Sequence, residues 1–317
     1  EINIKAEEKD LKSERDTLKK TLGSDSRLKT LIKNELLAVA EKFGDDRRSP
    51  LVERDEAKAF SELELVTADP ITVIMSEKGW IRAAKGHDID PASLSYKSGD
   101  GYKMSACGRS NQPAVVLDST GKAYTVTSHN LPSARGQGEP VTGRINPPSG
   151  ATFEGLMMGA EEALYLLASD AGYGFVARLG DLQSKNRSGK AALTLRKDSG
   201  AGVLQPAEIK TMDGALVAAV SNEGRLLIFP VSDLPQMARG KGNKIINIPS
   251  ARVKEREEFV VAIQVITPED NLVIHSGKRH RNFKLADLEH YRGERGQRGR
   301  KLPRGFQRVD RMEVAPR

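Results

Sequence analysis

The sequence predicts a mainly β protein: a propeller-like ring of five repeated units, preceded by a short α-helical segment. The main observation is a tight polar turn that recurs between two short apolar runs. These turns end at Gly79, Gly121, Gly172, Gly224 and Gly277. Successive glycines are separated by 42, 51, 52 and 53 residues. Because a unit of this size cannot bury its own apolar face, such repeats stack into arrays or rings.

The first 48 residues are predicted to be helical. Residues 1–22 are rich in Glu, Lys and Asp, with a thin apolar seam at Ile4, Leu11 and Leu18. A seven-residue spacing of this kind is typical of helices that pair with other helices. A second amphipathic helix follows after a glycine. Two helices with so short a break indicate either the end of a longer coiled coil or a local helical hairpin.

Residues 49–70 are polar and acidic, so we expect a linker there, and residues 71–317 are predicted to form the β domain. Continuous apolar runs are typical of strands buried on both faces. They lie at 71–75, 114–117, 163–168, 215–220 and 272–274. A turn with glycine joins each to a partner strand, as in hairpins with a bulge. The partners lie at 80–82, 122–126, 173–177, 225–229 and 279–284. Further strand-like runs, such as 191–195 and 245–248, bring each unit to the content of a four-stranded blade.

The best functional signal is a basic loop with glycines that follows each hairpin. The loops contain residues 96–101, 135–138, 185–190, 239–242 and 292–301. Glycine lets backbone amides approach an anion closely, and a flanking Arg or Lys supplies the opposite charge. Repeated at one place in every unit, such loops form a positive rim that can bind and bend a DNA duplex without reading its bases. Solvated turns are the alternative.

The candidate DNA-binding residues are the cations of these loops and of a dense basic cluster on the last hairpin. They are Lys97, Arg135, Lys185, Arg187, Lys190, Arg239, Lys241, Lys244, Lys278, Arg279, Arg281, Arg292, Arg295, Arg298 and Arg300. The net charge is +7, and residues 271–317 hold 13 Lys and Arg against 5 Asp and Glu. Such asymmetry indicates a polyanionic partner, although a solvated basic tail explains the charge equally well.

Sequence motifs for catalysis and metal binding are absent. The chain has no P-loop, G-x-S-x-G or H-E-x-x-H pattern. His87, Asp88 and Asp90 fit a polar loop better than an acid/base pair. The single cysteine, Cys107, excludes an internal disulfide and fits a reducing compartment. No apolar run approaches the roughly 20 residues that span a bilayer.

Several longer strings resemble the A subunit of the bacterial type IIA topoisomerases, and specifically that of topoisomerase IV. They are SEKGW at 76–80, GHDIDP at 86–91, YKSGDG at 96–101 and SARGQGEP at 133–140, with GDDRR at 44–48 after a helix. The resemblance extends over essentially the whole chain. It implies a five-bladed β-pinwheel, in which blades exchange strands. It also implies that residues 1–43 are the returning end of the coiled coil of the breakage-reunion domain.

The first basic loop separates the two main branches of this family. Gyrase carries a Q-R-R-G-G-K-G box in its first blade and uses it to wrap DNA. The corresponding place here resembles Tyr96–Gly101, which lacks the two arginines and carries Asp100 among its glycines. A carboxylate there repels phosphate, so the comparison favours topoisomerase IV.

The resemblance implies sequence-nonspecific duplex DNA binding, bending and substrate selection, in support of chromosome decatenation and supercoil relaxation by an ATP-dependent type II topoisomerase. The family's catalytic tyrosine, its neighbouring arginine and the winged-helix domain match nothing here, so the segment is expected to be non-catalytic. We expect no cofactor in it, because the family's ATP and Mg sites lie elsewhere. The chain begins inside a helix-like stretch without Met, as expected of the C-terminal part of a longer protein.

The implied partners are double-stranded DNA, the B subunit of topoisomerase IV, and a second A subunit, in the bacterial cytoplasm at the nucleoid. Two alternatives stay open. One is a propeller-like scaffold whose loops contact acidic proteins, and the other is the equivalent domain of the gyrase A subunit. A propeller enzyme fits poorly, because no acid/base or metal cluster occurs.

Overall fold

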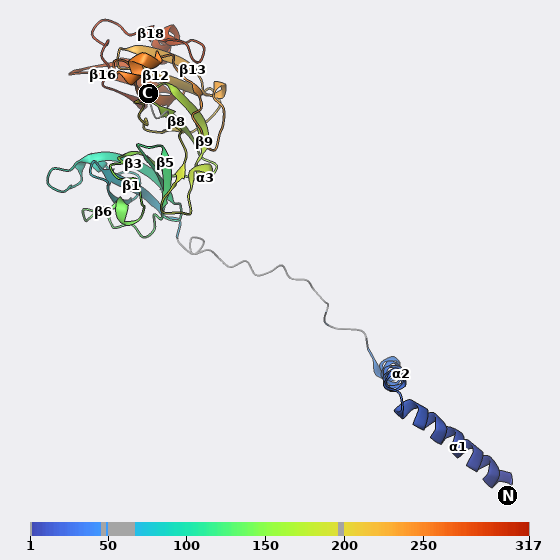
Figure 1. Cartoon of the computed structure of the whole chain (residues 1–317). Helices are drawn as coiled ribbons and strands as arrows, with labels where there is room; N and C mark the ends of the chain where they lie inside the picture. The colour runs from blue at the N-terminus through green and yellow to red at the C-terminus, as the bar shows by residue number, and fades with distance from the viewer. Residues whose placement is uncertain (1, 46–48, 50–66, 196–199, 317) are drawn as a thin grey trace. The chain divides into compact units, whose positions relative to one another are not determined.

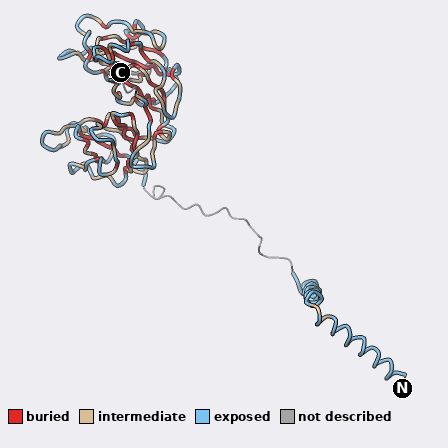
Figure 2. Tube along the Cα trace, in the orientation of Figure 1, coloured by how far each residue is buried: buried red, intermediate tan, exposed pale blue. Residues whose placement is uncertain are grey.

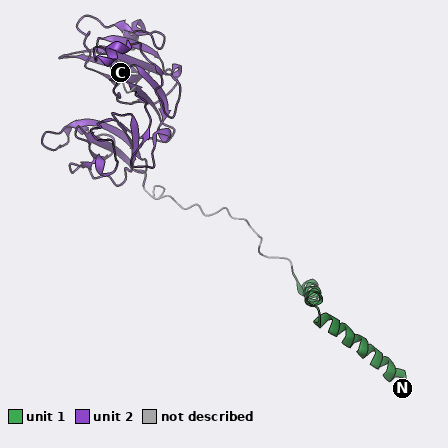
Figure 3. Cartoon of the chain, in the orientation of Figure 1, with its two compact units in different colours: residues 1–59 green, residues 60–317 purple. Residues whose placement is uncertain are grey.

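The computed structural model describes residues 2–45, 49, 67–195 and 200–316, and it divides into two compact units, residues 1–59 and 60–317 (Figure 3). Most of the linker predicted over residues 49–70, and the string at 46–48, lie outside the described residues. The first unit contains two helices, α1 (Ile2–Leu22) and α2 (Asp25–Phe43). The predicted helical segment is therefore confirmed.

Neither helix buries a side chain in this chain (Figure 2). The predicted seam residues Ile4, Leu11 and Leu18 are 69%, 59% and 54% exposed. In proteins, most of the stability of a helix comes from the packing of its amphipathic face rather than from helix propensity. Pairing of these helices with a further segment therefore stays a prediction.

The second unit consists of five antiparallel sheets, which confirms the predicted fold class (Figure 1). The first sheet has the order β3 (Tyr102–Arg109), β1 (Pro70–Ser76), β2 (Trp80–Lys85), β6 (Glu139–Pro140). The second has β7 (Phe153–Met157), β4 (Ala114–Asp118), β5 (Lys122–Val126), β10 (Lys190–Ala191). The third has β11 (Ala207–Ile209), β8 (Leu164–Ser169), β9 (Tyr173–Arg178), β14 (Asn243–Lys244). The fourth has β15 (Val260–Ile266), β12 (Leu216–Ser221), β13 (Arg225–Pro230), β18 (Arg300–Lys301). The fifth has β19 (Arg311–Pro316), β16 (Asp270–Ser276), β17 (Arg279–Phe283).

Each sheet except the last is completed by a strand from the next repeat. After the hairpin β4–β5, for example, the chain returns to the first sheet as β6 and then comes back to its own sheet as β7. The same path produces β10, β14 and β18, and we call these four short strands the return strands. Among the described residues there is no sixth hairpin to supply a return strand, and the fifth sheet has three strands. This exchange of strands is the pinwheel arrangement that the resemblance implied.

The hairpin strands are apolar throughout because they are buried on both faces. In β4, Ala114 and Val116 pack toward the first sheet, while Val115 and Leu117 pack toward the third. Four hydrophobic clusters of this kind join consecutive sheets. Within the described part of the chain, none joins the fifth sheet to the first. The sheets therefore follow an open arc rather than a closed ring (Figure 1).

Short helical turns follow the hairpins where Asx-Leu pairs occur in the sequence. They are α3 (Leu179–Leu182), η4 (Val231–Asp233) and α5 (Leu285–Leu288) with η5 (Glu289–Tyr291). The leucines of these pairs, Leu182, Leu234 and Leu288, are buried. Other short helices are η2 (Pro91–Ser93), η3 (Val141–Gly143) and α4 (Ser250–Lys254). The predicted strand at 191–195 is wrong beyond its first residue, and the one at 245–248 is wrong throughout, because the return strands are two residues long and end at 191 and 244.

The turn glycines have the left-handed conformation that the predicted hairpins require. Their φ angles lie between +56° and +83°. In four turns the glycine N–H donates to the carbonyl three residues earlier, at 2.9–3.0 Å. The second turn is further braced by Asp118, which is fully buried. Its carboxylate accepts hydrogen bonds from the Thr120 hydroxyl at 2.7 Å, Lys122 N–H at 2.9 Å and the Tyr124 hydroxyl at 2.8 Å.

We expect Asp118→Ala to lower the free energy of unfolding by about 2 kcal/mol, because it leaves the buried Tyr124 hydroxyl without its partner. Burial and the hydrogen bond and charge of Asp118 raise the pKa of Tyr124, so the phenol stays a donor. Urea unfolding measures the loss. The control is Tyr124→Phe, which removes only the phenol hydroxyl and its hydrogen bond to Asp118. It is expected to lower the free energy of unfolding by about 1 kcal/mol. Equal losses in the two variants contradict the bracing role.

Candidate nucleic-acid interface

Four of the predicted basic loops occupy equivalent positions, because each leads into a return strand. We call them the return loops; they are residues 133–138, 184–189, 236–242 and 292–299. Each begins beside the fourth residue of the second hairpin strand. Ala134 N–H donates to Ala83 O at 2.8 Å, and Met237 N–H donates to Val176 O at 2.8 Å. Gly293 N–H donates to Ile228 O at 3.0 Å. In the second sheet the Thr125 hydroxyl accepts from the backbone of Ser184 at 2.7 Å.

Each return loop ends in a glycine with positive φ that lies against the second residue of the same hairpin strand. These glycines are Gly138, Gly189, Gly242 and Gly299, with φ of +84°, +67°, +74° and +73°. A Cβ at Gly242 would lie 2.1 Å from Gly174 O, and one at Gly138 would lie 2.5 Å from Ile81 O. The glycines are therefore explained by docking of the return strand, whereas the sequence pattern alone had suggested approach of an anion.

Neighbouring return loops are joined into one continuous strip. Asn146, which follows the first return strand, donates to Arg187 O of the second loop at 2.7 Å. Gly240 of the third loop donates to Ala192 O at 2.9 Å. Asn247, after the third return strand, donates to Gln297 O of the fourth loop at 2.8 Å. The structure thus places the loop cations of four sheets along a single edge of the arc.

The predicted cations of this strip differ in what they contact. Those with exposed side chains and no carboxylate within 4 Å in the described structure include Arg135, Lys185 and Arg239. Among the described residues, two of the fifteen candidates form ion pairs: Arg292 with Glu289 at 3.0 Å, and Arg298 with Glu258 at 2.5 Å. Lys190 and Arg300 lie on the return strands β10 and β18.

Three candidate arginines have a structural role in addition to their charge. Arg187 Nε donates to Arg144 O at 2.8 Å, and Arg295 donates to Lys244 O at 2.9 Å. Arg298 donates to Asn247 O at 2.9 Å as well as to Glu258. Each reaches the preceding return strand or the segment that follows it. These arginines therefore help to hold the strip together.

The loop that carries Lys97 is connected to the strip differently from the return loops. In the described part of the chain no sheet precedes the first repeat, and its loop forms no return strand but packs on its own hairpin. Buried Arg82 donates to Ser95 O at 2.9 Å and to Gly136 O at 2.7 Å, which joins this loop to the first return loop. Lys97 Nζ lies 3.2 Å from the ring centre of Trp80.

The cluster of Lys278, Arg279 and Arg281 lies on the fifth sheet, where its side chains are exposed. Arg279 and Arg281 belong to β17, whose outer edge has no return strand in the described structure. Arg281 lies 5.1 Å from the ring centre of Phe283. This cluster stands at the position that a fifth return loop would cover.

Two aromatic residues that begin hairpin strands, one on β2 and one on β9, were not among the residues predicted for this surface. Trp80 and Tyr173 are both half-buried. Tyr173 lies under Lys241, whose Nζ is 3.5 Å from the ring centre. Their position directly after the turn glycine, opposite a return strand, is the signal that could have identified them.

Other site types find little support in the described part of the chain. It contains no group of three or more His, Cys, Asp or Glu side chains that could hold a metal ion. It contains no helix that is both long and apolar enough to cross a bilayer. Cys107 is a free thiol.

Comparison with known proteins identifies close relatives. Residues 164–201 and 216–267 match the family model of the DNA gyrase C-terminal domain, a β-propeller. The chain is 54% identical over 99% of its length to the A subunit of DNA topoisomerase 4 from Pseudomonas aeruginosa, and 48% identical, again over 99%, to that of Escherichia coli K12. It spans 41% of the length of each of these relatives.

Solved structures agree with this result. The structure of the E. coli ParC C-terminal domain matches with a TM-score of 0.69 and 46% identity, over 79% of this chain and 100% of that chain. The DNA gyrase A C-terminal domain, at 15% identity and a TM-score of 0.56 over 76% of this chain and 81% of that chain, shares the fold. The chain therefore belongs to the family of DNA topoisomerase IV A subunits, and it contains their C-terminal β-pinwheel domain.

Proposed function

We propose that this chain binds duplex DNA without reading its sequence, along the strip formed by the return loops. The observation that carries the proposal is the hydrogen-bonded contact of consecutive loops, each of which brings Arg or Lys side chains to one edge. DNA phosphates are evenly spaced and equally charged in every sequence, so a continuous basic strip binds them non-specifically.

The mechanism is geometric. The sheets that carry the return loops follow an open arc (Figure 1), so a duplex that contacts the loops of several sheets must bend. Smooth bending of a 20–30 bp site costs on the order of 1–6 kcal/mol, which the additional phosphate contacts offset. The bent duplex is then presented to the cleavage gate of the enzyme.

In the complete protein, we propose that this domain selects DNA substrates for an ATP-dependent type II topoisomerase that decatenates chromosomes and relaxes supercoils. The segment itself is non-catalytic in this proposal. Its protein partners are the B subunit of the enzyme, together with a second A subunit, and its location is the bacterial cytoplasm. Family membership supports this assignment, because the relatives are A subunits of DNA topoisomerase 4.

Asp100 supports topoisomerase IV over gyrase as the functional parallel. Partial burial raises the pKa of this carboxyl, but hydrogen bonds from Ser76 and from the backbone of Lys78 and Gly101 outweigh it and lower the pKa below its ordinary value. The group is therefore ionised at neutral pH in the first loop. A fixed negative charge there repels phosphate and weakens a tight wrap.

A salt titration of duplex binding by the whole chain tests this function. We expect the logarithm of affinity to fall linearly with the logarithm of salt concentration, with a slope of about −5 or steeper, because each neutralised phosphate contributes about −0.9. Two duplexes of unrelated sequence are expected to give the same slope and affinities within about threefold. A flat titration, or a strong preference for one sequence, is incompatible with the proposal.

A further inference from the structure

A pocket of about 220 Å³ lies on the third sheet, beside the hairpin turn and the return strand β14. Ala171, Tyr173, Lys241 and Lys244 line it. Lys241 Nζ lies over the Tyr173 ring, and Lys244 Nζ donates to Asn247 Oδ1 at 3.2 Å. Among the described residues, no Asp or Glu lines the pocket, and neither lysine has a carboxylate within 4 Å. Two ammonium groups thus share a recess in which the described residues supply no counter-charge.

The two lysine positions recur in the fourth sheet. Lys244 and Lys301 each pair with the first residue of the second hairpin strand. Lys241 and Arg298 each precede the positive-φ glycine of a return loop. The two sheets therefore present cations at matched places, and they can be compared directly.

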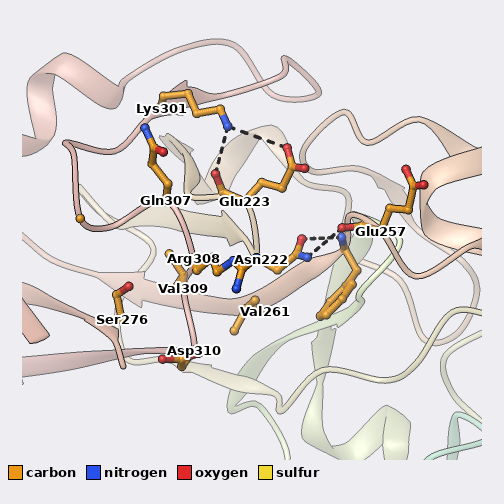
Figure 4. A pocket seen from close by; sticks show the side chains of 12 residues that line it. Asn222, Glu223, Glu257, Val261, Ser276, Lys301, Gln307, Arg308, Val309 and Asp310 are labelled. Carbon is orange, nitrogen blue, oxygen red and sulfur yellow. Dashed lines mark hydrogen bonds and ion pairs between the residues drawn. The ribbon is translucent and has the colours of Figure 1, made fainter. Parts of the chain in front are cut away.

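In the fourth sheet, both cations form ion pairs with carboxylates. Arg298 contacts Glu258 at 2.5 Å, and Lys301 Nζ lies 3.8 Å from Glu223 (Figure 4). Glu223 is the third residue of its hairpin turn, the place held by Ala171 in the third sheet. Among the described residues, the third-sheet pocket is the same arrangement without its own carboxylates, so its two lysines are open to an external anion.

We propose that this pocket binds one phosphate group, with Lys241 and Lys244 as its counter-charges and the Tyr173 ring as the platform that holds Lys241. Lysine binds phosphate as a compact point charge and needs no planar geometry. The pocket is smaller than the roughly 300–1,000 Å³ of drug-sized sites, which suits one phosphate with its sugar rather than a cofactor. The phosphate belongs either to the DNA backbone or to a free anion. The first source deepens the proposed function and rests on it; the second does not.

Nuclear magnetic resonance of the whole ¹⁵N-labelled chain distinguishes these sources. Inorganic phosphate and a short duplex are titrated separately into the unchanged chain, Ala171→Glu and Ala171→Gln. We expect both ligands to shift the amide signals of Lys241 and Lys244 in the unchanged chain and in the glutamine variant. The glutamate variant installs the charge that Glu223 supplies in the fourth sheet. The affinity of the Ala171→Glu variant for both ligands is expected to be roughly tenfold lower, because the new carboxylate compensates the lysine charges that would neutralise a phosphate.

Each outcome decides a different point. Shifts with duplex alone assign the phosphate to DNA, and shifts with inorganic phosphate alone support a free-anion pocket while contradicting DNA binding at this sheet. If neither ligand shifts these amide signals, or if the Glu and Gln variants respond equally, the proposed phosphate site is wrong. If Ala171→Glu does not fold, Lys244→Gln provides the same comparison. If the duplex shifts no amide signal anywhere in the unchanged chain, the proposed function is refuted, whatever the result at this pocket.

Discussion

A variant that loses four cations of the return loops is expected to bind duplex DNA roughly 10²–10³-fold more weakly at 0.1 M salt, with a salt slope shallower by about three to four units. The four residues are Arg135, Lys185, Arg239 and Lys241. None of them has a carboxylate within 4 Å in the described structure, so alanine removes charge without stranding a partner. Fluorescence anisotropy with a labelled duplex over a series of salt concentrations measures both quantities.

The control for this variant carries the same change in net charge on the helical unit. It replaces four exposed lysines of the two helices: Lys9, Lys19, Lys29 and Lys33. Alanine is the best helix former, so these helices should be preserved. We expect this control to retain the slope of the unchanged chain within about one unit. If both variants lose affinity equally, net charge rather than the strip governs binding.

The largest effect on stability is expected from Gly242→Ala, at roughly 4 kcal/mol. A left-handed backbone costs an L-residue about 1–2 kcal/mol, and the new Cβ would lie 2.1 Å from Gly174 O. Gly174 O belongs to the paired backbone of β9 and Gly242 directly precedes β14, so relief of the clash requires β14 to leave the sheet. A shift of about 10 °C in thermal midpoint follows for a domain of this size. Scanning calorimetry measures it.

Gly150→Ala separates the two causes. Gly150 also has positive φ, at +78°, but no atom lies within 4 Å of the added Cβ. This variant is expected to lose only about 1–2 kcal/mol, the cost of the backbone conformation. Similar midpoints for the two variants would mean that strand docking at Gly242 contributes little. A lowered DNA affinity for Gly242→Ala alone would link the docking of β14 to the strip.

The hairpins could be predicted from sequence because their signals are local. A turn glycine and two flanking apolar runs lie within about a dozen residues, and burial on both faces leaves an unbroken apolar run. The return strands could not be predicted, since two residues carry no period. The run at 245–248 shows the difficulty: Ile245, Ile246 and Ile248 are buried, but they pack as a loop behind β14.

In the candidate site, too, features that depend on nearby residues could be predicted, whereas contacts between residues far apart in the sequence could not. Spacing along the chain was sufficient to place four basic loops at one position of the repeat. It could not show which cations are already neutralised, because Glu258 precedes Arg298 by 40 residues and is fully buried. Nor could it reveal that Arg82 ties the loop of Lys97 to Gly136, 54 residues beyond Arg82.

Strand exchange also sets an order of events during synthesis on the ribosome. Trp80 of the first sheet can pair with Pro140, and Arg225 of the fourth sheet with Lys301, only after both residues of the pair have been synthesised. Each of these sheets therefore stays incomplete until 60 to 76 further residues have emerged. At about 5–20 residues per second, that interval lasts on the order of several seconds. Throughout it, the outer edge of the newest hairpin is an unpaired template for other strands. A nascent chain of this design therefore always exposes one open edge, which moves toward the C-terminus as translation proceeds.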